Sequence, residues 1–204
     1  MSDFSGLPPI YFLRHGETDW NRERRIQGQI DIALNARGRE QARKMAAKLA
    51  EVMPAIDGFR LYASPLGRAC QTIAAVLTAY GLPESEVTRD ERLKELSFGN
   101  FEGRPWSDVH ALGIAPEVRP EEYHDWRPPG GESYADGRTR VGDWLESLDR
   151  PAIVVAHGGI SRILRGLVFN LPRREIVQLK VPQDRFFRIE GGGLDWFDAR
   201  ERDT

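Results

Sequence analysis

The sequence predicts an α/β fold, a three-layer α/β/α domain in which helices cover both faces of a mostly parallel central sheet. Short apolar runs alternate along the chain with segments whose apolar residues recur at helical spacing. Strands that alternate with helices in this way favour parallel pairing through right-handed crossovers. The chain has 204 residues without an internal repeat or a linker, which predicts one domain over residues 1–204.

The first strand–helix pair follows from an apolar run and a cap. The run at residues 10–13 reads as a buried strand, and the loop at residues 28–35 is expected to be exposed. Asn35 is an N-cap candidate for a helix whose apolar residues repeat at helical spacing until Pro54.

The second pair begins with a buried strand at residues 59–63. We interpret Ser64 as the N-cap and Pro65 as the first residue of the next helix. That helix ends at Gly81, since glycine commonly follows the last helical residue.

The middle of the chain differs in composition. Residues 97–133 collect many glycines and prolines and are too long for a plain connection, so we expect an inserted, partly helical lid. Ser133 is the expected N-cap of the helix that follows. A buried strand at residues 152–156, a helix after it and a closing hairpin within residues 185–197 complete the chain.

Charge and cysteine content exclude several classes of protein. The formal net charge of -2 and the pI near 6.1 give no polybasic surface for nucleic acid or acidic membranes. Cys70 is the only cysteine, which excludes an internal disulfide and suits a reducing compartment. No signal-type or long apolar segment is visible, so we expect a cytoplasmic protein without a membrane partner.

Two predicted strands end in a histidine followed by glycine. Arg14, His15 and Gly16 follow the first strand in a glycine-permitted turn, and His157 and Gly158 follow the strand at residues 152–156. Ligands of open α/β sheets bind at the carboxyl ends of the strands. A guanidinium next to an imidazole suits a phosphate, and the helix N-terminus at Gly158 can receive an anion. The alternative is a strand end with two exposed polar residues.

Arg68 and Glu95 are two further candidates. Arg68 falls in the first turn of a predicted helix, where the helix dipole disfavours a cation unless a bound anion is present. It could instead be an ordinary solvated arginine. Glu95 lies between apolar residues, which favour a protonated carboxyl that can act as a general acid. From the sequence alone an ordinary exposed glutamate is the more probable interpretation of Glu95.

Four motifs now resemble those of the histidine phosphatase superfamily, which has the phosphoglycerate mutase-like fold. They occur in the family's order at residues 14–21, 64–72, 93–103 and 156–159. The resemblance implies a phosphohistidine at His15 and a proton donor at Glu95. The catalytic residues that it implies are His15, Glu95, His157, Arg14 and Arg68. The substrate-binding residues that it implies are Arg14, Asn21, Gln27, Arg68, His157 and Gly158.

The implied activity is that of a metal-independent phosphomonoesterase of the histidine acid phosphatase type, acting on a small phosphorylated metabolite without a cofactor. Alternatives are a cofactor-dependent phosphoglycerate mutase and an inactive phosphate-binding module. A metallohydrolase is disfavoured because the histidines lack zinc-ligand spacing. A homodimer is left open.

Two features favour a phosphatase over a mutase. Residues 96–99, directly after Glu95, resemble the phosphatase branch of the family. Residues 117–127 mix Arg119 and Arg127 with four acidic residues, so this part of the lid offers no net positive field for a second anionic group.

Overall fold

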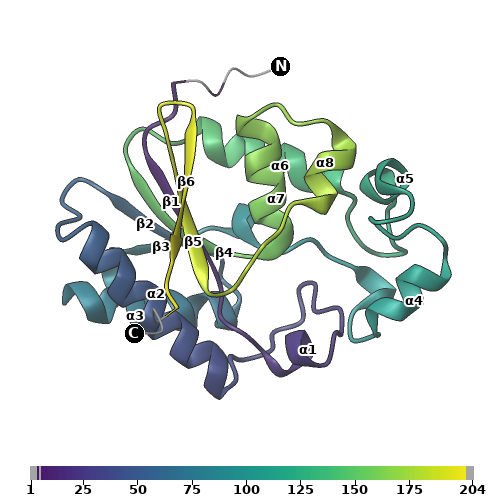
Figure 1. Cartoon of the computed structure of the whole chain (residues 1–204), viewed down its shortest axis with the longest axis horizontal. Coiled ribbons are helices and arrows are strands. Elements are labelled where there is room, and N and C mark those ends of the chain that lie inside the picture. The colour runs from purple at the N-terminus through teal and green to yellow at the C-terminus, as the bar shows by residue number, and fades with distance from the viewer. Residues whose placement is uncertain (1–3, 5, 201–204) are drawn as a thin grey trace.

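The computed structural model describes residue 4 and residues 6–200, and a six-stranded sheet forms its centre (Figure 1). The strands are β1 (Ile10–Arg14), β2 (Arg60–Ala63), β3 (Val87–Arg89), β4 (Ala152–Ala156), β5 (Arg185–Glu190) and β6 (Gly193–Asp198). They lie in the order β3-β2-β4-β1-β5-β6. The first four of these are parallel, whereas β5 and β6 form an antiparallel hairpin at one edge. The mostly parallel sheet and the closing hairpin are as predicted.

Helices cover both faces of the sheet, because successive side chains of a strand point to opposite faces and apolar residues occupy both. Tyr11 and Leu13 of β1 pack with α2 (Ala36–Val52) and α3 (Gly67–Tyr80) on one face. Ile10 and Phe12 face the other side and pack with α6 (Tyr134–Glu146), α7 (Gly158–Val168) and α8 (Arg173–Gln178). Figure 1 shows these two helical layers on opposite sides of the strands. Within the described residues, no helix is long and apolar enough to cross a bilayer.

The pairing of β1 with β4 sets the position of the two histidines. The strands run parallel in a register that places Arg14 opposite Ala156. The amide of His15 continues this ladder by donating to the carbonyl oxygen of Ala156 over 3.0 Å. His15 and His157, each the first residue beyond its strand, therefore lie side by side at the carboxyl edge of the sheet.

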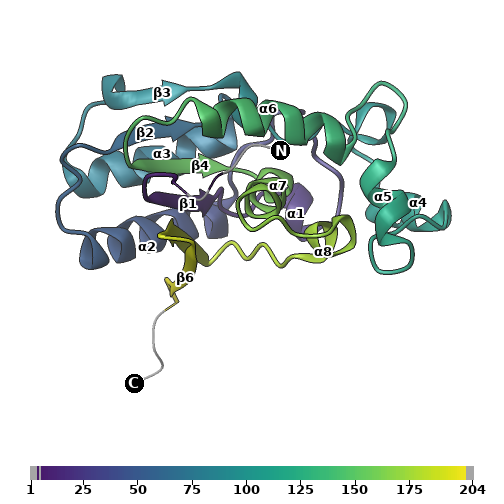
Figure 2. The same cartoon turned by 90° about the horizontal axis from the view of Figure 1, so that it is seen from above.

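Apart from β3, short helical elements fill the segment between α3 and α6. These are the 3₁₀ turns η1 (Glu84–Glu86), η2 (Glu91–Leu93) and η3 (Gly99–Phe101), and the helices α4 (Trp106–Ala111) and α5 (Pro120–Asp125). Another short helix, α1 (Asp19–Arg22), follows β1. In Figure 2, α4 and α5 lie at one end of the molecule, beyond the carboxyl ends of β1 and β4. The ion pair between Arg173 and Asp125, at 2.8 Å, links α5 to α8.

The start of α3 differs from the prediction. The helix begins at Gly67, and Ser64 does not cap it; Ser64 hydrogen-bonds to His157 instead, and Pro65 lies in the preceding turn. The acceptor at this helix start comes from a distant loop, where Asp31 Oδ1 accepts from the amide of Gly67 over 2.8 Å. An acidic side chain complements the helix dipole there, which a local pattern could not predict.

The loop at residues 28–35 and the turn at Gly16 also differ from expectation. The loop is only partly exposed, because Gly28 and Leu34 are buried in it. Gly16 is not among the residues with positive φ, so its backbone conformation does not require glycine. Glycine is needed there because a side chain would have no room. A Cβ on Gly16 would lie 2.1 Å from the carbonyl oxygen of Gly38 in α2, and one on Gly38 would lie 2.0 Å from the carbonyl oxygen of Glu17.

Candidate active site

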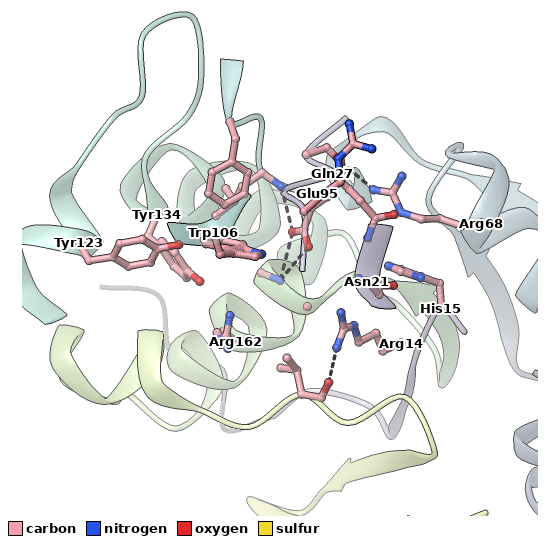
Figure 3. Close-up of a pocket in the computed structure, with 17 residues that line it drawn as sticks. Arg14, His15, Asn21, Gln27, Arg68, Glu95, Trp106, Tyr123, Tyr134 and Arg162 are labelled. Atoms are coloured by element: carbon pink, nitrogen blue, oxygen red, sulfur yellow. Dashed lines mark hydrogen bonds between the residues drawn. The ribbon is translucent and has the colours of Figure 1, made fainter. Parts of the chain in front are cut away.

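A cavity of about 260 Å³ opens beyond the carboxyl ends of β1 and β4 (Figure 3). Its walls come from the turn after β1, the start of α3, the segment that carries Glu95, the lid region and α7. Every residue that the sequence predicted for the site lines this cavity, with the exception of His157. Residues that are far apart in the sequence therefore meet in one place, as expected for residues at the carboxyl ends of parallel strands.

His15 is held as a neutral imidazole with one defined tautomer. Its side chain is buried, and its Nδ1 lies 2.7 Å from the carbonyl oxygen of Gly16. A carbonyl oxygen only accepts, so Nδ1 carries the proton and Nε2 keeps its lone pair. Burial and the charges of Arg68 and Arg14 hold the pKa of His15 well below its usual value. The ring is thus neutral at neutral pH, with a lone pair on Nε2 that can attack an electrophile.

His157 lies behind His15 and does not line the cavity. Its ring is fully buried, with its centroid 5.1 Å from that of His15. Nε2 is 2.7 Å from Ser64 Oγ, whereas Nδ1 is buried without a hydrogen-bond partner. Burial, followed by the charge of Arg68, lowers the pKa of His157 well below its usual value. An unpaired buried ring nitrogen is available for a ligand, because such atoms are usually satisfied.

Two arginines flank His15, and backbone carbonyls hold each of them. Arg14 Nη1 donates to the carbonyl oxygen of Val181 over 2.5 Å. Arg68 is fully buried and donates to the carbonyl oxygens of Gly28 and Ile30, at 2.7 and 2.8 Å. In both guanidinium groups Nε has no partner.

Both guanidinium groups remain positively charged at neutral pH. Burial lowers the pKa of Arg14 to about 10, while the nearby Glu95 opposes this shift. The pKa of Arg68 is lowered by burial in the same way. No ion pair neutralises either arginine within the described residues, so two adjacent cations face the cavity without a paired carboxylate. Such an arrangement suits a phosphoryl group, which presents several anionic oxygens.

The side chain of Glu95 lies next to the first turn of α7. Both of its carboxyl oxygens lie 3.1 Å from the amide nitrogen of Gly159, and Oε1 also accepts from the amide of Leu96 at 3.0 Å. This position of the carboxyl group depends on glycine at residue 159, since a Cβ there would lie 2.5 Å from Glu95 Oε1. The carboxyl group is thus aimed into the cavity instead of into solvent (Figure 3).

Asn21 and Gln27 complete the wall beside His15. Asn21 Oδ1 accepts from the Thr18 amide at 3.2 Å and from Gln183 Nε2 at 3.0 Å. Gln27 is buried, and its side-chain oxygen accepts from the Thr18 hydroxyl over 2.9 Å. Thr18, which the sequence analysis did not single out, therefore positions both amides.

The other end of the cavity was not predicted. Figure 3 shows Arg162, Tyr123 and Tyr134 on the side of Glu95 opposite His15. Arg162 Nε donates to the carbonyl oxygen of Leu179 over 2.9 Å, and Arg162 forms no ion pair in the part of the chain that the structure describes. Burial raises the pKa of both phenols, so they remain hydrogen-bond donors.

A sequence signal for Arg162 did exist. It lies four residues after Gly158 on α7, and residues at this spacing share a helix face. By contrast, Arg119 and Arg127, which we considered as lid cations, are exposed and pair with Glu122 and Asp136 outside the cavity. Within the described residues, no group of three or more His, Cys, Asp or Glu side chains could hold a metal ion.

Comparison with known proteins identifies a family. The sequence model of the Histidine phosphatase superfamily (branch 1) matches residues 10–196. The chain is 34% identical over 175 residues to a glucosyl-3-phosphoglycerate phosphatase of Mycolicibacterium vanbaalenii, covering 80% of this chain and 75% of that one. It is 32% identical to a probable phosphoglycerate mutase GpmB of Salmonella paratyphi C, covering 92% and 86%.

Solved structures agree with this match. The structure of a mycobacterial glucosyl-3-phosphoglycerate phosphatase superposes with a TM-score of 0.74 at 27% identity, covering 94% of this chain and 96% of that one. The same phosphatase in complex with VO3 gives a TM-score of 0.75 at 29% identity, with the same coverage.

Proposed function

The chain belongs to branch 1 of the histidine phosphatase superfamily, and we propose on that basis that it hydrolyses a small phosphorylated metabolite through a phosphohistidine on His15. The predicted class, a phosphomonoester hydrolase, is confirmed by the family match and the phosphatase relatives. The observation that carries the mechanism is the neutral His15 ring, with its Nε2 lone pair, between two arginines without paired carboxylates.

The first step transfers the phosphoryl group. Nε2 of His15 attacks the phosphorus in line, the N–P bond forms and the bond to the leaving oxygen breaks. Arg14 and Arg68 stabilise the charge on the phosphoryl oxygens, and positioning plus such stabilisation provides most of the catalysis of phosphoryl transfer. The unpaired Nδ1 of His157 would reach these oxygens only from behind His15, because His157 does not line the cavity.

Glu95 acts as general acid and then as general base. It gives its proton to the leaving oxygen in the first step, and the resulting carboxylate takes a proton from water in the second. The hydroxide equivalent attacks the phosphorus, the N–P bond breaks, and inorganic phosphate leaves His15 as a neutral imidazole again. None of these steps uses a metal ion, so we propose a metal-independent enzyme.

The far end of the cavity indicates what the leaving group carries. A planar guanidinium and two phenol donors match the two oxygens of a carboxylate. Residues 97–133, which contribute Phe98, Trp106 and Tyr123, would cover such a leaving group as a lid. The named substrate of the mycobacterial relatives, glucosyl-3-phosphoglycerate, is an acid of this kind. We therefore propose a phosphorylated organic acid or its sugar derivative as substrate.

Rapid quenching tests the phosphohistidine. Wild-type protein mixed with ³²P-labelled 3-phosphoglycerate in the presence of EDTA should trap an acid-labile label on His15 and release inorganic phosphate. The His15→Ala variant should trap none, whereas His110→Ala, at an exposed histidine, should label normally.

Three outcomes would contradict the proposal. A label on another residue would remove His15 as nucleophile. Loss of activity in EDTA with recovery on adding zinc would refute metal independence. Rapid formation of 2-phosphoglycerate with little free phosphate, in the presence of catalytic 2,3-bisphosphoglycerate, would favour the mutase that some relatives are named for.

A further inference from the structure

Glu95 lies in a segment without regular secondary structure, between η2 and η3. An irregular segment does not hold a side chain in place by its own ladder of hydrogen bonds. General acid catalysis nevertheless requires the carboxyl group within hydrogen-bonding distance of the leaving oxygen. Contacts from elsewhere in the fold must therefore fix this part of the backbone.

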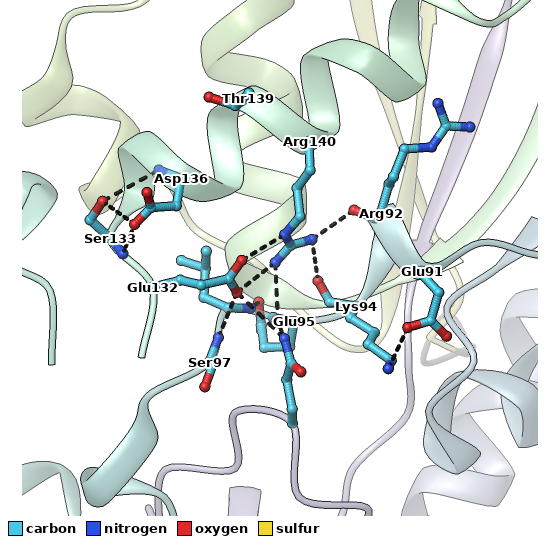
Figure 4. Close-up of polar contacts among 12 residues, drawn as sticks. Glu91, Arg92, Lys94, Glu95, Ser97, Glu132, Ser133, Asp136, Thr139 and Arg140 are labelled. Carbon is cyan, nitrogen blue, oxygen red and sulfur yellow. Dashed lines mark hydrogen bonds and ion pairs between the residues drawn. The ribbon is translucent and has the colours of Figure 1, made fainter. Parts of the chain in front are cut away.

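Arg140 of α6 supplies most of these contacts from the side away from the cavity (Figure 4). Its Nη1 donates to the carbonyl oxygens of Arg92 and Lys94, at 2.6 and 2.7 Å. Its Nη2 donates to the carbonyl oxygen of Glu95 itself, at 3.2 Å. One guanidinium thus binds three carbonyl groups of the short segment that ends at the proposed acid.

Glu132 ties the same group to the residues that follow. Its two carboxyl oxygens accept from Nε and Nη2 of Arg140, at 3.0 and 3.1 Å. Its Oε2 also accepts from the amide of Ser97 at 2.9 Å. Gln29 adds a bond of 3.0 Å from its amide nitrogen to the Glu95 carbonyl oxygen. The backbone is held on both sides of Glu95.

This pair is better suited to fixing geometry than to adding stability. The Arg140 and Glu132 side chains are 18% and 25% exposed, and the desolvation of such a partly buried pair offsets much of its attraction. A planar guanidinium with a bidentate partner, however, fixes direction as well as distance. No other cation among the described residues donates to the carbonyl oxygens of Lys94 and Glu95.

We propose that Arg140, oriented by Glu132, is a positioning residue that holds the Glu95 backbone so that the carboxyl group reaches the leaving oxygen. Arg140 is not part of the cavity lining and touches no substrate, so it acts only through Glu95. The inference rests on the general-acid role given to Glu95 above.

The test compares two esters with different leaving groups. Glycerol 3-phosphate has a poor alkoxide leaving group that needs protonation, whereas 4-nitrophenyl phosphate has a good one. In Arg140→Gln, kcat for the alkyl ester should fall roughly 10- to 100-fold, the effect of misplacing a reacting group by about 1 Å. The fall for the aryl ester should be at least fivefold smaller, roughly, because protonation matters less there. Arg140→Lys should recover little, since an ammonium cannot bind the three carbonyl groups and Glu132 together.

Arg138→Gln is the matched control, because Arg138 lies on the same helix and makes none of these contacts. It should leave the ratio of the two kcat values unchanged. If Arg140→Gln is poorly folded by circular dichroism, the measurement is made with Glu132→Gln, which removes the bidentate pair from the other side.

A double-mutant cycle separates positioning from a general structural role. In a Glu95→Gln background, Arg140→Gln should have almost no further effect on the alkyl ester, because the group that it positions is gone. Additive losses, or equal losses for both esters, would overturn the inference while leaving the proposed function intact. If Glu95→Gln alone shows no dependence on the leaving group, the acid role of Glu95 fails, and the inference fails with it.

Discussion

Arg162 distinguishes the leaving-group end of the cavity from the phosphoryl end. Both ends carry cations, but Arg14 and Arg68 lie next to His15, whereas Arg162 lies among phenols. Burial disfavours the charged form of Arg162, but the oxygens of Tyr134 and Tyr123 outweigh this, and the pKa of the guanidinium is raised. The charge of Glu95 adds to this effect, so the cation is stable there without a direct ion pair, and it can bind a carboxylate from a substrate.

A matched pair of substrates tests this residue. 3-Phosphoglycerate and glycerol 3-phosphate differ in whether a carboxylate or a hydroxymethyl group stands at one carbon. In Arg162→Gln, the ratio of their kcat/KM values should fall roughly 10- to 100-fold, the usual effect of losing a hydrogen bond to a charged group. Tyr134→Phe should lower the ratio roughly 2- to 10-fold.

The exposed Arg173 provides the control, and Arg173→Gln should leave this ratio unchanged. A ratio that stays constant in Arg162→Gln would mean that the carboxylate binds elsewhere or that the substrate has none.

Sequence reasoning could predict the residues at the His15 end of the cavity, but not those at the Arg162 end. Arg14, His15 and His157 follow directly from the rule that parallel strands end at one edge of a sheet. Tyr123 lies in α5, whose place depends on the fold of residues 97–133 and on docking against α8, and Tyr134 begins α6. That they meet in the cavity is not a property of a short sequence pattern. The shape and charge of the Arg162 end are thus set by tertiary contacts more than by motifs.

At the scale of elements, the first turn of α7 connects the two chemical roles of the site. It follows His157 directly, and its second residue, Gly159, donates its amide to Glu95. The closeness of the carboxyl group to this helix start depends on the missing side chain of Gly159.

Gly159→Ala should therefore displace the acid without unfolding the protein. The added Cβ would lie 2.5 Å from Glu95 Oε1, which is the flexible end of a side chain and can move away. For alkyl phosphates kcat should fall roughly 10- to 1,000-fold, within the range that general acid catalysis contributes. Gly142→Ala in α6 is the control, because nothing lies within 4 Å of its added Cβ.

For Gly142→Ala, activity should be unchanged and stability should rise by about 0.5–1 kcal/mol, the helix preference for alanine. Normal turnover of alkyl phosphates by Gly159→Ala would show that Glu95 does not need this position.

Helices and strands could be predicted where the residues that define them are neighbours in the sequence. Asn35 and Ser133 do cap α2 and α6, since a side-chain oxygen three residues before a free amide is visible in the sequence. The start of α3 was predicted wrongly because its acceptor, Asp31, comes from another loop. The three-residue strand β3 and the helix α8 were missed, because each is too short for a recognisable period.

At the scale of the whole molecule, the two buried histidines at the strand ends, His15 and His157, link folding to pH. Burial holds the pKa of both rings well below 6.5 in the folded state, whereas unfolding returns them to about 6.5. Below that pH the unfolded chain binds more protons than the folded one, so the free energy of unfolding falls as the pH falls. The stabilisation is complete above pH 6.5 and is lost progressively toward the lowered native pKa values.

Each histidine should contribute a slope of about 1.4 kcal/mol per pH unit in that window. Urea unfolding at several pH values between 5 and 7 should therefore show a shallower pH dependence for the double variant His15→Gln, His157→Gln than for the wild type. His110→Gln, at an exposed position, should keep the wild-type slope. An identical slope in the double variant would show that these rings are already protonated in the folded protein.

The contact between Gly16 and Gly38 has an evolutionary consequence. Each position excludes a side chain because of backbone atoms in the other segment, so a change at either one moves α2 against the turn that carries His15. No second substitution at the partner site can compensate, since glycine is already the smallest residue. The exposed residues of α2 can therefore vary, whereas Gly38 in its first turn cannot be replaced in a single step without displacing the turn that carries His15.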